Sequence, residues 1–172
     1  SKSEIAIGYE VSVTTLQMAM AYSAIGNGGV LMKPQLIQKL KTPKGHEQKI
    51  DRMDALRRVA SEKTMHTMSD ILEKAVSQGT GNKAFLPNLK IAGKTGTAKK
   101  LKNGKYVSEY IASFASFYPS DDPEYTLIVT VDHPRSGGYT GGMVAAPIAK
   151  EIYRRIYNLK GRDAEPYLQA SV

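Results

Sequence analysis

The residues with the clearest capacity for chemistry form one short run, Ile91-Ala92-Gly93-Lys94-Thr95-Gly96-Thr97-Ala98. The run is typical of a strand, yet it contains a lysine, two hydroxyls and two glycines. Glycine weakens a strand unless a ligand or another backbone must approach closely, so its presence indicates a site. Alternation along a strand places Lys94 and Gly96 on one face and Thr95 and Thr97 on the other. A twist or bulge would gather ammonium, hydroxyl and N–H groups around one anion; an ordinary edge strand is the alternative.

Two nucleotide-binding patterns overlap this region, and both fail on context. Gly93-Lys94-Thr95 matches the end of a phosphate-binding loop, but Asn88 stands where that loop needs glycine, and a strand-like segment follows instead of a helix. Gly79-Thr80-Gly81-Asn82-Lys83-Ala84 fits a dinucleotide pattern, but Gly79 closes a predicted helix, whereas such a loop opens one. The run is therefore predicted to hold an anion other than a nucleotide phosphate.

Two helices are predicted before the run. Thr14 and Gln17 have the spacing of a capping box and predict a helix over 14–26, ended by the Gly- and Asn-rich residues 26–29. Ser61 can cap a second helix, which Gly79 or Gly81 ends. Its predicted apolar stripe consists of Met65, Met68, Ile71, Leu72, Ala75 and Val76. Between the helices we expect short extended segments at 30–32 and 35–40, then an exposed loop or hairpin over 41–54.

Three successive antiparallel strands are predicted over 89–100, 106–118 and 125–132, because they are separated by the turn-forming residues Lys102-Asn103-Gly104 and Ser120-Asp121-Asp122-Pro123. A closing helix over 144–159 is expected to pack on this sheet through Val144, Ile148, Ile152 and Ile156. These elements predict an α+β fold for residues 1–160, with residues 161–172 as a loosely held tail.

Composition narrows the possible functions. The chain has 172 residues, a formal net charge of +8 and no cysteine, which excludes disulfides, thiol catalysis and Cys-ligated zinc. The basic excess suits a nucleic acid, an anionic membrane face or an anionic wall polymer. With no Trp and three Phe, the chain lacks the aromatic platform of single-strand nucleic-acid binders, so nucleic acid is disfavoured. No apolar run reaches the roughly 18–20 residues that span a bilayer.

The histidines do not suggest a metal centre. His46, His66 and His133 are scattered, and His46-Glu47 lacks the second histidine of a metallopeptidase helix. His133 lies at a predicted exit from a strand, near the predicted site, with no visible carboxylate partner in the sequence. We therefore expect no metal.

Lys94-Thr95-Gly96-Thr97-Ala98 resembles the Lys-Thr-Gly motif of penicillin-recognising serine enzymes. The flanking segments make the resemblance more specific, because together they are similar to class B penicillin-binding proteins over residues 5 to about 160, and closer to the division type than to the elongation type. The segments that carry it are Gly8-Tyr9-Glu10-Val11-Ser12-Val13-Thr14-Thr15-Leu16-Gln17, Ala24-Ile25-Gly26-Asn27-Gly28-Gly29, Gly79-Thr80-Gly81 and Gly141-Gly142-Met143-Val144-Ala145-Ala146-Pro147.

The resemblance implies a fold in which helices surround a five-stranded antiparallel sheet, of which this chain supplies three strands. It implies that Lys94 directs positive charge at the substrate, that Thr95 and Thr97 bind its carboxylate through their hydroxyls, and that the Thr97 N–H forms half of an oxyanion hole. Gly96 would leave room for the substrate. Residues expected near the groove are Gly79, Thr80, Gly81, Tyr139, Gly141 and Gly142. No metal or organic cofactor is implied.

The chain also departs from the family pattern. No serine stands three residues before a lysine, and no Ser-x-Asn occurs, so the acylating serine and the middle motif are expected upstream of residue 1. The chain is then the C-terminal half of a transpeptidase domain, inactive by itself. The missing half of the domain, or an oligomeric or crystal contact, is expected to cover its open sheet edge; otherwise the chain is expected to be only marginally stable.

The parent protein implied by the resemblance is a D,D-transpeptidase that cross-links peptidoglycan in the bacterial cell envelope. It would act on D-alanyl-D-alanine stem peptides, be acylated by β-lactams, and work in a complex for wall synthesis or division. Its place would be the periplasmic or extracytoplasmic face of the inner membrane, held by an anchor outside this chain. The alternative is a non-catalytic module that binds peptides or wall polymer.

Overall fold

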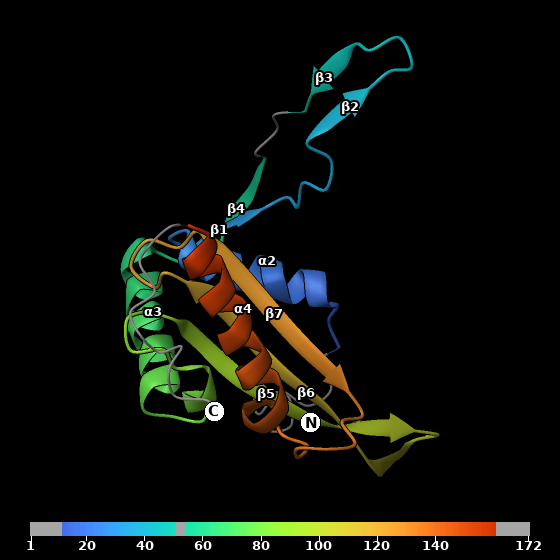
Figure 1. The fold of residues 1–172 in the computed structure, drawn as a ribbon, viewed down its shortest axis with the longest axis vertical. Helices are drawn as coiled ribbons and strands as arrows, with labels where there is room; N and C mark the ends of the chain where they lie inside the picture. Colours follow the sequence, from blue (N-terminus) through green and yellow to red (C-terminus); the bar gives the residue numbers. More distant parts are fainter. Residues whose placement is uncertain (1–11, 51–53, 161–172) are drawn as a thin grey trace.

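The computed structural model describes residues 12–50 and 54–160, and it shows helices arranged around one three-stranded sheet, with a long extension to one side (Figure 1). In chain order the elements are α2 (Thr15–Gly26), β1 (Val30–Met32), β2 (Lys39–Lys41), β3 (Glu47–Lys49), β4 (Ala55–Arg58), α3 (Glu62–Ser77), η1 (Asn82–Ala84), β5 (Ala92–Lys102), β6 (Lys105–Tyr118), β7 (Tyr125–Asp132), η2 (Gly141–Ala145) and α4 (Ala146–Leu159). This mixture of helices and antiparallel sheets confirms the predicted α+β class.

The largest sheet has the strand order β5-β6-β7, and both pairings are antiparallel. The β5–β6 pairing runs from Ala92↔Phe117 to Lys102↔Lys105, so this hairpin continues past the last β6–β7 pair, Ile111↔Asp132. The hairpin turns at residues 103 and 104, whose φ angles of 51° and 75° match the predicted Asn-Gly turn. The three successive antiparallel strands are thus confirmed, with β5 at one edge of the sheet.

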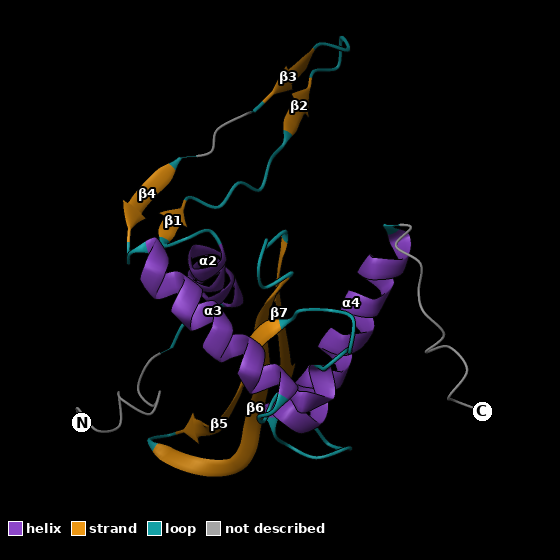
Figure 2. Ribbon diagram, turned by 90° about the vertical axis from the view of Figure 1, so that its left-hand side faces the viewer, coloured by secondary structure: helices purple, strands orange, loops and turns teal. Residues whose placement is uncertain are grey.

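Each face of the sheet is covered by different helices, with α4 on one side and α2 and α3 on the other (Figure 2). Phe114 is fully buried on the α4 side and belongs to the same apolar cluster as Tyr153 of α4. Phe117 points to the opposite side, where Tyr22 and Ile25 of α2 pack against it. Side-chain alternation along β6 therefore serves two cores, which hold the sheet rigidly between the helices.

Helix α4 buries a different stripe from the predicted one. Ala146, Ala149 and Tyr153 are fully buried, whereas Ile148 is 44% exposed. The two alanines let the helix axis approach the sheet closely, so this face packs inward in place of the bulkier isoleucine at 148. Ile152 and Ile156 lie beside the buried line and pack against the core, as predicted.

The two helices before the main sheet begin where predicted. The Thr14 hydroxyl accepts from the Gln17 N–H at 3.1 Å, and the Gln17 side chain accepts from the Thr14 N–H at 2.8 Å, which confirms the capping box of α2. Ser61 caps α3. The α3 stripe is only partly as predicted, because Met68 is 37% exposed. Four α3 residues are buried, namely Met65, Ser69, Leu72 and Val76. This line runs straight down the helix, which leaves Met68 and Ile71 on its exposed flank.

Residues 33–50 and 54–57, called the arm below, extend away from the helices and the main sheet (Figure 1). It contains the hairpin of β2 and β3, in agreement with the hairpin predicted within 41–54, and Leu36 on it is 83% exposed. Strand β4, which pairs with β1, was not predicted. The predicted tail over 161–172 and the similar segment over 8–11 lie outside the described residues.

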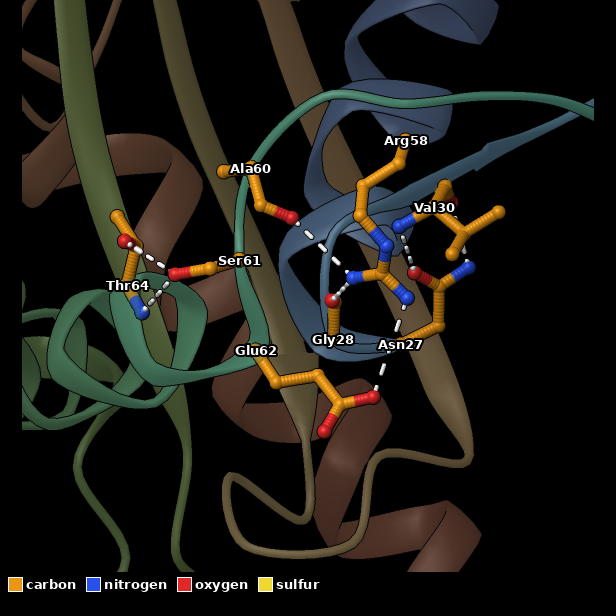
Figure 3. A network of polar contacts seen from close by, with 8 residues as sticks. All are labelled: Asn27, Gly28, Val30, Arg58, Ala60, Ser61, Glu62 and Thr64. Atoms are coloured by element: carbon orange, nitrogen blue, oxygen red, sulfur yellow. Dashed lines mark hydrogen bonds and ion pairs between the residues drawn. The ribbon is translucent and has the colours of Figure 1, made fainter.

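The arm is held at its root by hydrogen bonds between the end of α2 and the start of α3 (Figure 3). The Arg58 guanidinium donates to the carbonyl oxygens of Gly28 at 2.7 Å and Ala60 at 3.2 Å, and it lies 3.9 Å from the Glu62 carboxylate. Gly29 has φ of 95°, and a Cβ there would lie 2.3 Å from the Ala60 oxygen, so only glycine fits. The root therefore fixes where α3 begins.

Candidate functional site

The Lys94 ammonium lies at the free edge of β5, close to two threonine hydroxyls. Its Nζ is 3.3 Å from Thr95 Oγ1, 3.4 Å from Thr80 Oγ1 and 3.1 Å from the Thr95 carbonyl oxygen. The two hydroxyls are 2.8 Å apart. Because no strand of the described chain pairs with the outer edge of β5, the long lysine side chain can reach round it to the hydroxyls on the other face.

The Lys94 charge has no carboxylate partner among residues 12–50 and 54–160, because the ion pairs of the described chain involve other lysines. Lys94 itself is exposed. An exposed ammonium beside two hydroxyls presents several hydrogen-bond donors to one point, which is the arrangement that binds a carboxylate.

Thr97 has a different partner, the segment that precedes α4. Its Oγ1 accepts a hydrogen bond from the Gly141 N–H at 3.1 Å. A hydroxyl that accepts from a backbone N–H keeps its own proton free, so Thr97 can still donate to a ligand. The exposed Thr97 side chain therefore has a hydroxyl oriented by the fold.

Three glycines make this packing possible. A Cβ on Gly96 would lie 2.5 Å from Ser113 Oγ, and a Cβ on Gly141 would lie 2.1 Å from the Ser113 carbonyl oxygen and 2.5 Å from that of Gly96. A Cβ on Gly142 would lie 2.6 Å from the Thr80 carbonyl oxygen. The strand, the turn after α3 and η2 therefore meet backbone against backbone, which agrees with the close approach that the sequence predicted.

Most of the predicted site residues come together in this place. Gly79, Thr80 and Gly81 form the turn that ends α3, and the Gly81 N–H donates to the Ala75 carbonyl oxygen at 3.0 Å. Tyr139 lies beside Tyr110 of β6, with ring centroids 4.4 Å apart, and is half-exposed. The roles of these residues toward a substrate stay predictions, since the geometry shows their proximity and not their ligand.

A network of charged residues beyond the site was not foreseen. Glu109 of β6 accepts from Lys102 Nζ at 2.5 Å and lies 3.0 Å from His133 Nδ1, so His133 has the carboxylate partner that the sequence did not reveal. Lys100 Nζ is 3.9 Å from Glu109 and also pairs with Asp132. The sequence does not predict the contact between Glu109 and His133, because that contact depends on which residue of β6 lies next to the end of β7.

The Lys102 ammonium, and after it the His133 ring, lower the pKa of the Glu109 carboxyl from 4.5 to about 2.

Within the described residues no three His, Asp or Glu side chains converge as metal ligands would. In the same part of the chain, no helix combines the length and the apolar character that crossing a membrane requires.

Comparison with known families shows which family the chain belongs to. A family profile described as "Penicillin binding protein transpeptidase domain" matches residues 1–154. The chain belongs to this transpeptidase family. The resemblance drawn from Lys94 to Ala98 and its flanks is therefore confirmed.

Relatives of the transpeptidase chain agree with this assignment. This chain is 41% identical over 151 residues to stage V sporulation protein D of Bacillus subtilis, a match that covers 87% of this chain. It is 36% identical over 149 residues to the peptidoglycan D,D-transpeptidase FtsI of Escherichia coli, a match that covers 86% of this chain. These matches cover only 23% and 24% of the two relatives, so the chain spans about a quarter of their length.

Solved structures show the same fold. Penicillin binding protein 3 of Mycobacterium tuberculosis, complexed with aztreonam, superposes with a TM-score of 0.83 at 31% identity, covering 94% of this chain and 38% of that one. The transpeptidase domain of penicillin-binding protein 3 from Burkholderia pseudomallei superposes with a TM-score of 0.75, covering 94% of this chain and 47% of that one.

Proposed function

We propose that the protein to which this chain contributes is a serine-type peptidoglycan D,D-transpeptidase of the division type. The observation that carries the proposal is the Lys94 ammonium, which has no carboxylate partner within residues 12–50 and 54–160 and is held beside the Thr80 and Thr95 hydroxyls. Relatives named peptidoglycan D,D-transpeptidase support the reaction class, and a relative solved with aztreonam supports β-lactam binding. The substrate is a stem peptide that ends in D-alanyl-D-alanine.

The reaction is an acyl transfer in two steps. A serine hydroxyl attacks the amide carbonyl between the two D-alanine residues, its proton passes to the leaving amine, and D-alanine departs. The amine of a second stem peptide then attacks the ester, and the serine is released. The chain itself contains no Ser-x-x-Lys, so the serine comes from outside residues 1–172.

This chain supplies the side of the site that holds the terminal carboxylate during the first step, before that carboxylate departs with D-alanine. Lys94 provides positive charge, and the hydroxyls of Thr95 and Thr97 donate to the carboxylate oxygens. The Thr97 N–H donates to the developing oxyanion. Removing one oxyanion donor costs about 3–4 kcal/mol of transition-state stabilisation in other hydrolases, so this contribution is large. We place the protein at the extracytoplasmic face of the membrane, where it joins a complex for wall synthesis.

A fluorescent penicillin tests the proposal on the whole protein. The wild type is expected to form one covalent adduct, detected on a denaturing gel. Lys94→Met removes the ammonium that faces the β-lactam carboxylate, and a lost charge-assisted hydrogen bond lowers the second-order labelling rate about 10- to 100-fold. Lys44→Met is the matched control, because Lys44 is an exposed lysine on the arm, and it labels at the wild-type rate.

Two results would contradict the proposal. A wild-type protein that forms no adduct is not a penicillin-reactive transpeptidase. A Lys94→Met protein that reacts as fast as Lys44→Met does not use this strand to hold the ligand. Residues 1–172 alone are expected to form no adduct, and labelling of that fragment at a serine would show that the nucleophile lies within it.

A further inference from the structure

The charged network around Glu109 joins the two segments that flank the candidate site. One is the β5–β6 hairpin, which continues directly from the strand that carries Lys94 and Thr97. The other is the loop over 133–140, which leads from β7 to Gly141. Glu109 contacts both, through Lys100 and Lys102 on the hairpin and through His133 at the start of the loop.

Glu109 links the two segments from the centre of the charged network, where the side chains are least exposed. Its side chain is 25% exposed and that of Lys100 is 22% exposed, whereas Lys102 and Asp132 are more than half exposed. The least exposed cation and anion therefore lie at the centre, where screening by water is weakest. The His133 backbone has φ of 50°, and its N–H donates to the Tyr110 carbonyl oxygen at 2.9 Å, so the loop leaves β7 in one fixed direction.

The loop is held again at its far end, next to the site. Tyr139 stacks against Tyr110, the neighbour of Glu109 on β6, at a centroid distance of 4.4 Å. Two residues later, the Gly141 N–H donates to Thr97 Oγ1. Two consecutive residues of β6 thus hold both ends of the loop that orients the Thr97 hydroxyl.

We infer that Glu109 is a positioning residue for transpeptidation: its carboxylate ties the hairpin after Thr97 to the loop that delivers Gly141, and so fixes the Thr97 hydroxyl against the substrate carboxylate. This inference rests on the proposed function. Without the Glu109 charge, Lys102 and His133 lose their carboxylate, and Lys100 keeps only Asp132. A neutral acceptor holds the two segments more weakly than a carboxylate does, so the hairpin and the loop can shift apart.

The test uses the whole protein and a fluorescent penicillin, with the labelling rate constant measured separately from the final labelled fraction. Glu109→Gln keeps the size of the side chain and removes its charge. Misplacement by 1 Å can cost about 100-fold in rate, so a fraction of that displacement predicts a loss of about tenfold for Glu109→Gln. Asp121→Asn is the matched control, because Asp121 forms a 2.7 Å pair with Lys90 in the turn at the opposite end of β6, and its labelling rate changes less than about twofold.

A second pair of variants separates positioning from stability. In a Thr97→Val background the oriented hydroxyl is gone, so Glu109→Gln is expected to slow labelling by less than about twofold further. A general loss of folding would lower the final labelled fraction in both backgrounds and leave the rate constant unchanged. An equal fold-loss of the rate constant in both backgrounds, or no loss with Thr97 present, overturns the inference. If the wild type itself is not labelled, the proposed function fails instead.

Discussion

Replacing Gly141 by alanine tests the backbone contact on which the site depends. A Cβ at this position would lie 2.1 Å from the Ser113 carbonyl oxygen and 2.5 Å from the Gly96 carbonyl oxygen. Real Cβ atoms keep at least 3.0 Å, so η2 must withdraw by about 1 Å from β5 and β6. Gly141 does not have a positive φ, so alanine can adopt its backbone and the penalty is purely steric.

The expected loss of stability follows from this displacement. Neither oxygen can move aside, because both belong to paired strands. Overpacking of this kind costs about 1–3 kcal/mol, and the weakened Gly141 N–H bond to Thr97 adds about 0.5–1.5 kcal/mol. The free energy of unfolding of the whole protein should therefore fall by about 1.5–4.5 kcal/mol if the transition is two-state. The penicillin labelling rate should fall as well, because the Thr97 hydroxyl loses its orientation.

Urea denaturation followed by circular dichroism measures the first effect, and labelling with a fluorescent penicillin measures the second. Gly45→Ala is the control. Gly45 has φ of 84° and no atom within 4 Å of its would-be Cβ, so alanine there strains the arm without a clash and leaves labelling unchanged. If Gly141→Ala unfolds and labels like the wild type, η2 does not lie against the two strands, and the proposed orientation of Thr97 is wrong.

Three further predictions concern residues outside this contact. Ser116→Ala removes the 2.9 Å partner of the buried Tyr153 hydroxyl and should destabilise the protein by about 1–3 kcal/mol in urea denaturation, whereas Tyr153→Phe in the same background should recover part of the loss. The pKa of the Glu109 carboxyl is lowered from 4.5 to about 2, so its stabilising effect is complete above pH 4.5 and is lost as the pH falls toward 2. The difference in unfolding free energy between the wild type and Glu109→Gln should therefore shrink as the pH falls over that interval. A difference that stays constant would contradict the ion pairs of Glu109. Arg58→Met leaves the Gly28 carbonyl to water and should cost about 1 kcal/mol without changing penicillin labelling; a labelling defect equal to that of Lys94→Met would show that the arm root influences the site.

Local sequence signals predicted most of the fold. Thr14 with Gln17, and Ser61 by itself, marked the helix starts because capping depends on residues three positions apart. The Asn103-Gly104 turn marked the hairpin because these residues adopt positive φ. Such signals need no knowledge of distant contacts, so they could be recognised in the sequence.

The errors arose where tertiary packing decides the outcome. Ile148 was predicted on the buried stripe of α4, but helical periodicity does not say which of two adjacent stripes faces the sheet, and small alanines favoured the other one. Met68 was predicted in the core for a similar reason. The partner of His133 could not be predicted, because Glu109 lies 24 positions earlier and only the strand register brings the two together.

The root of the arm is fixed by specific contacts, whereas the residues beyond it can change in length and sequence. Arg58 and Gly29 fix the ends of the arm against α2 and α3, while every residue of β2 and β3 is exposed. The entropy of closing a loop grows only with the logarithm of its length, so residues added or removed beyond the root cost little. The arm can therefore become longer or shorter, or change its charged residues, during evolution, while the strand that carries Lys94 keeps its geometry.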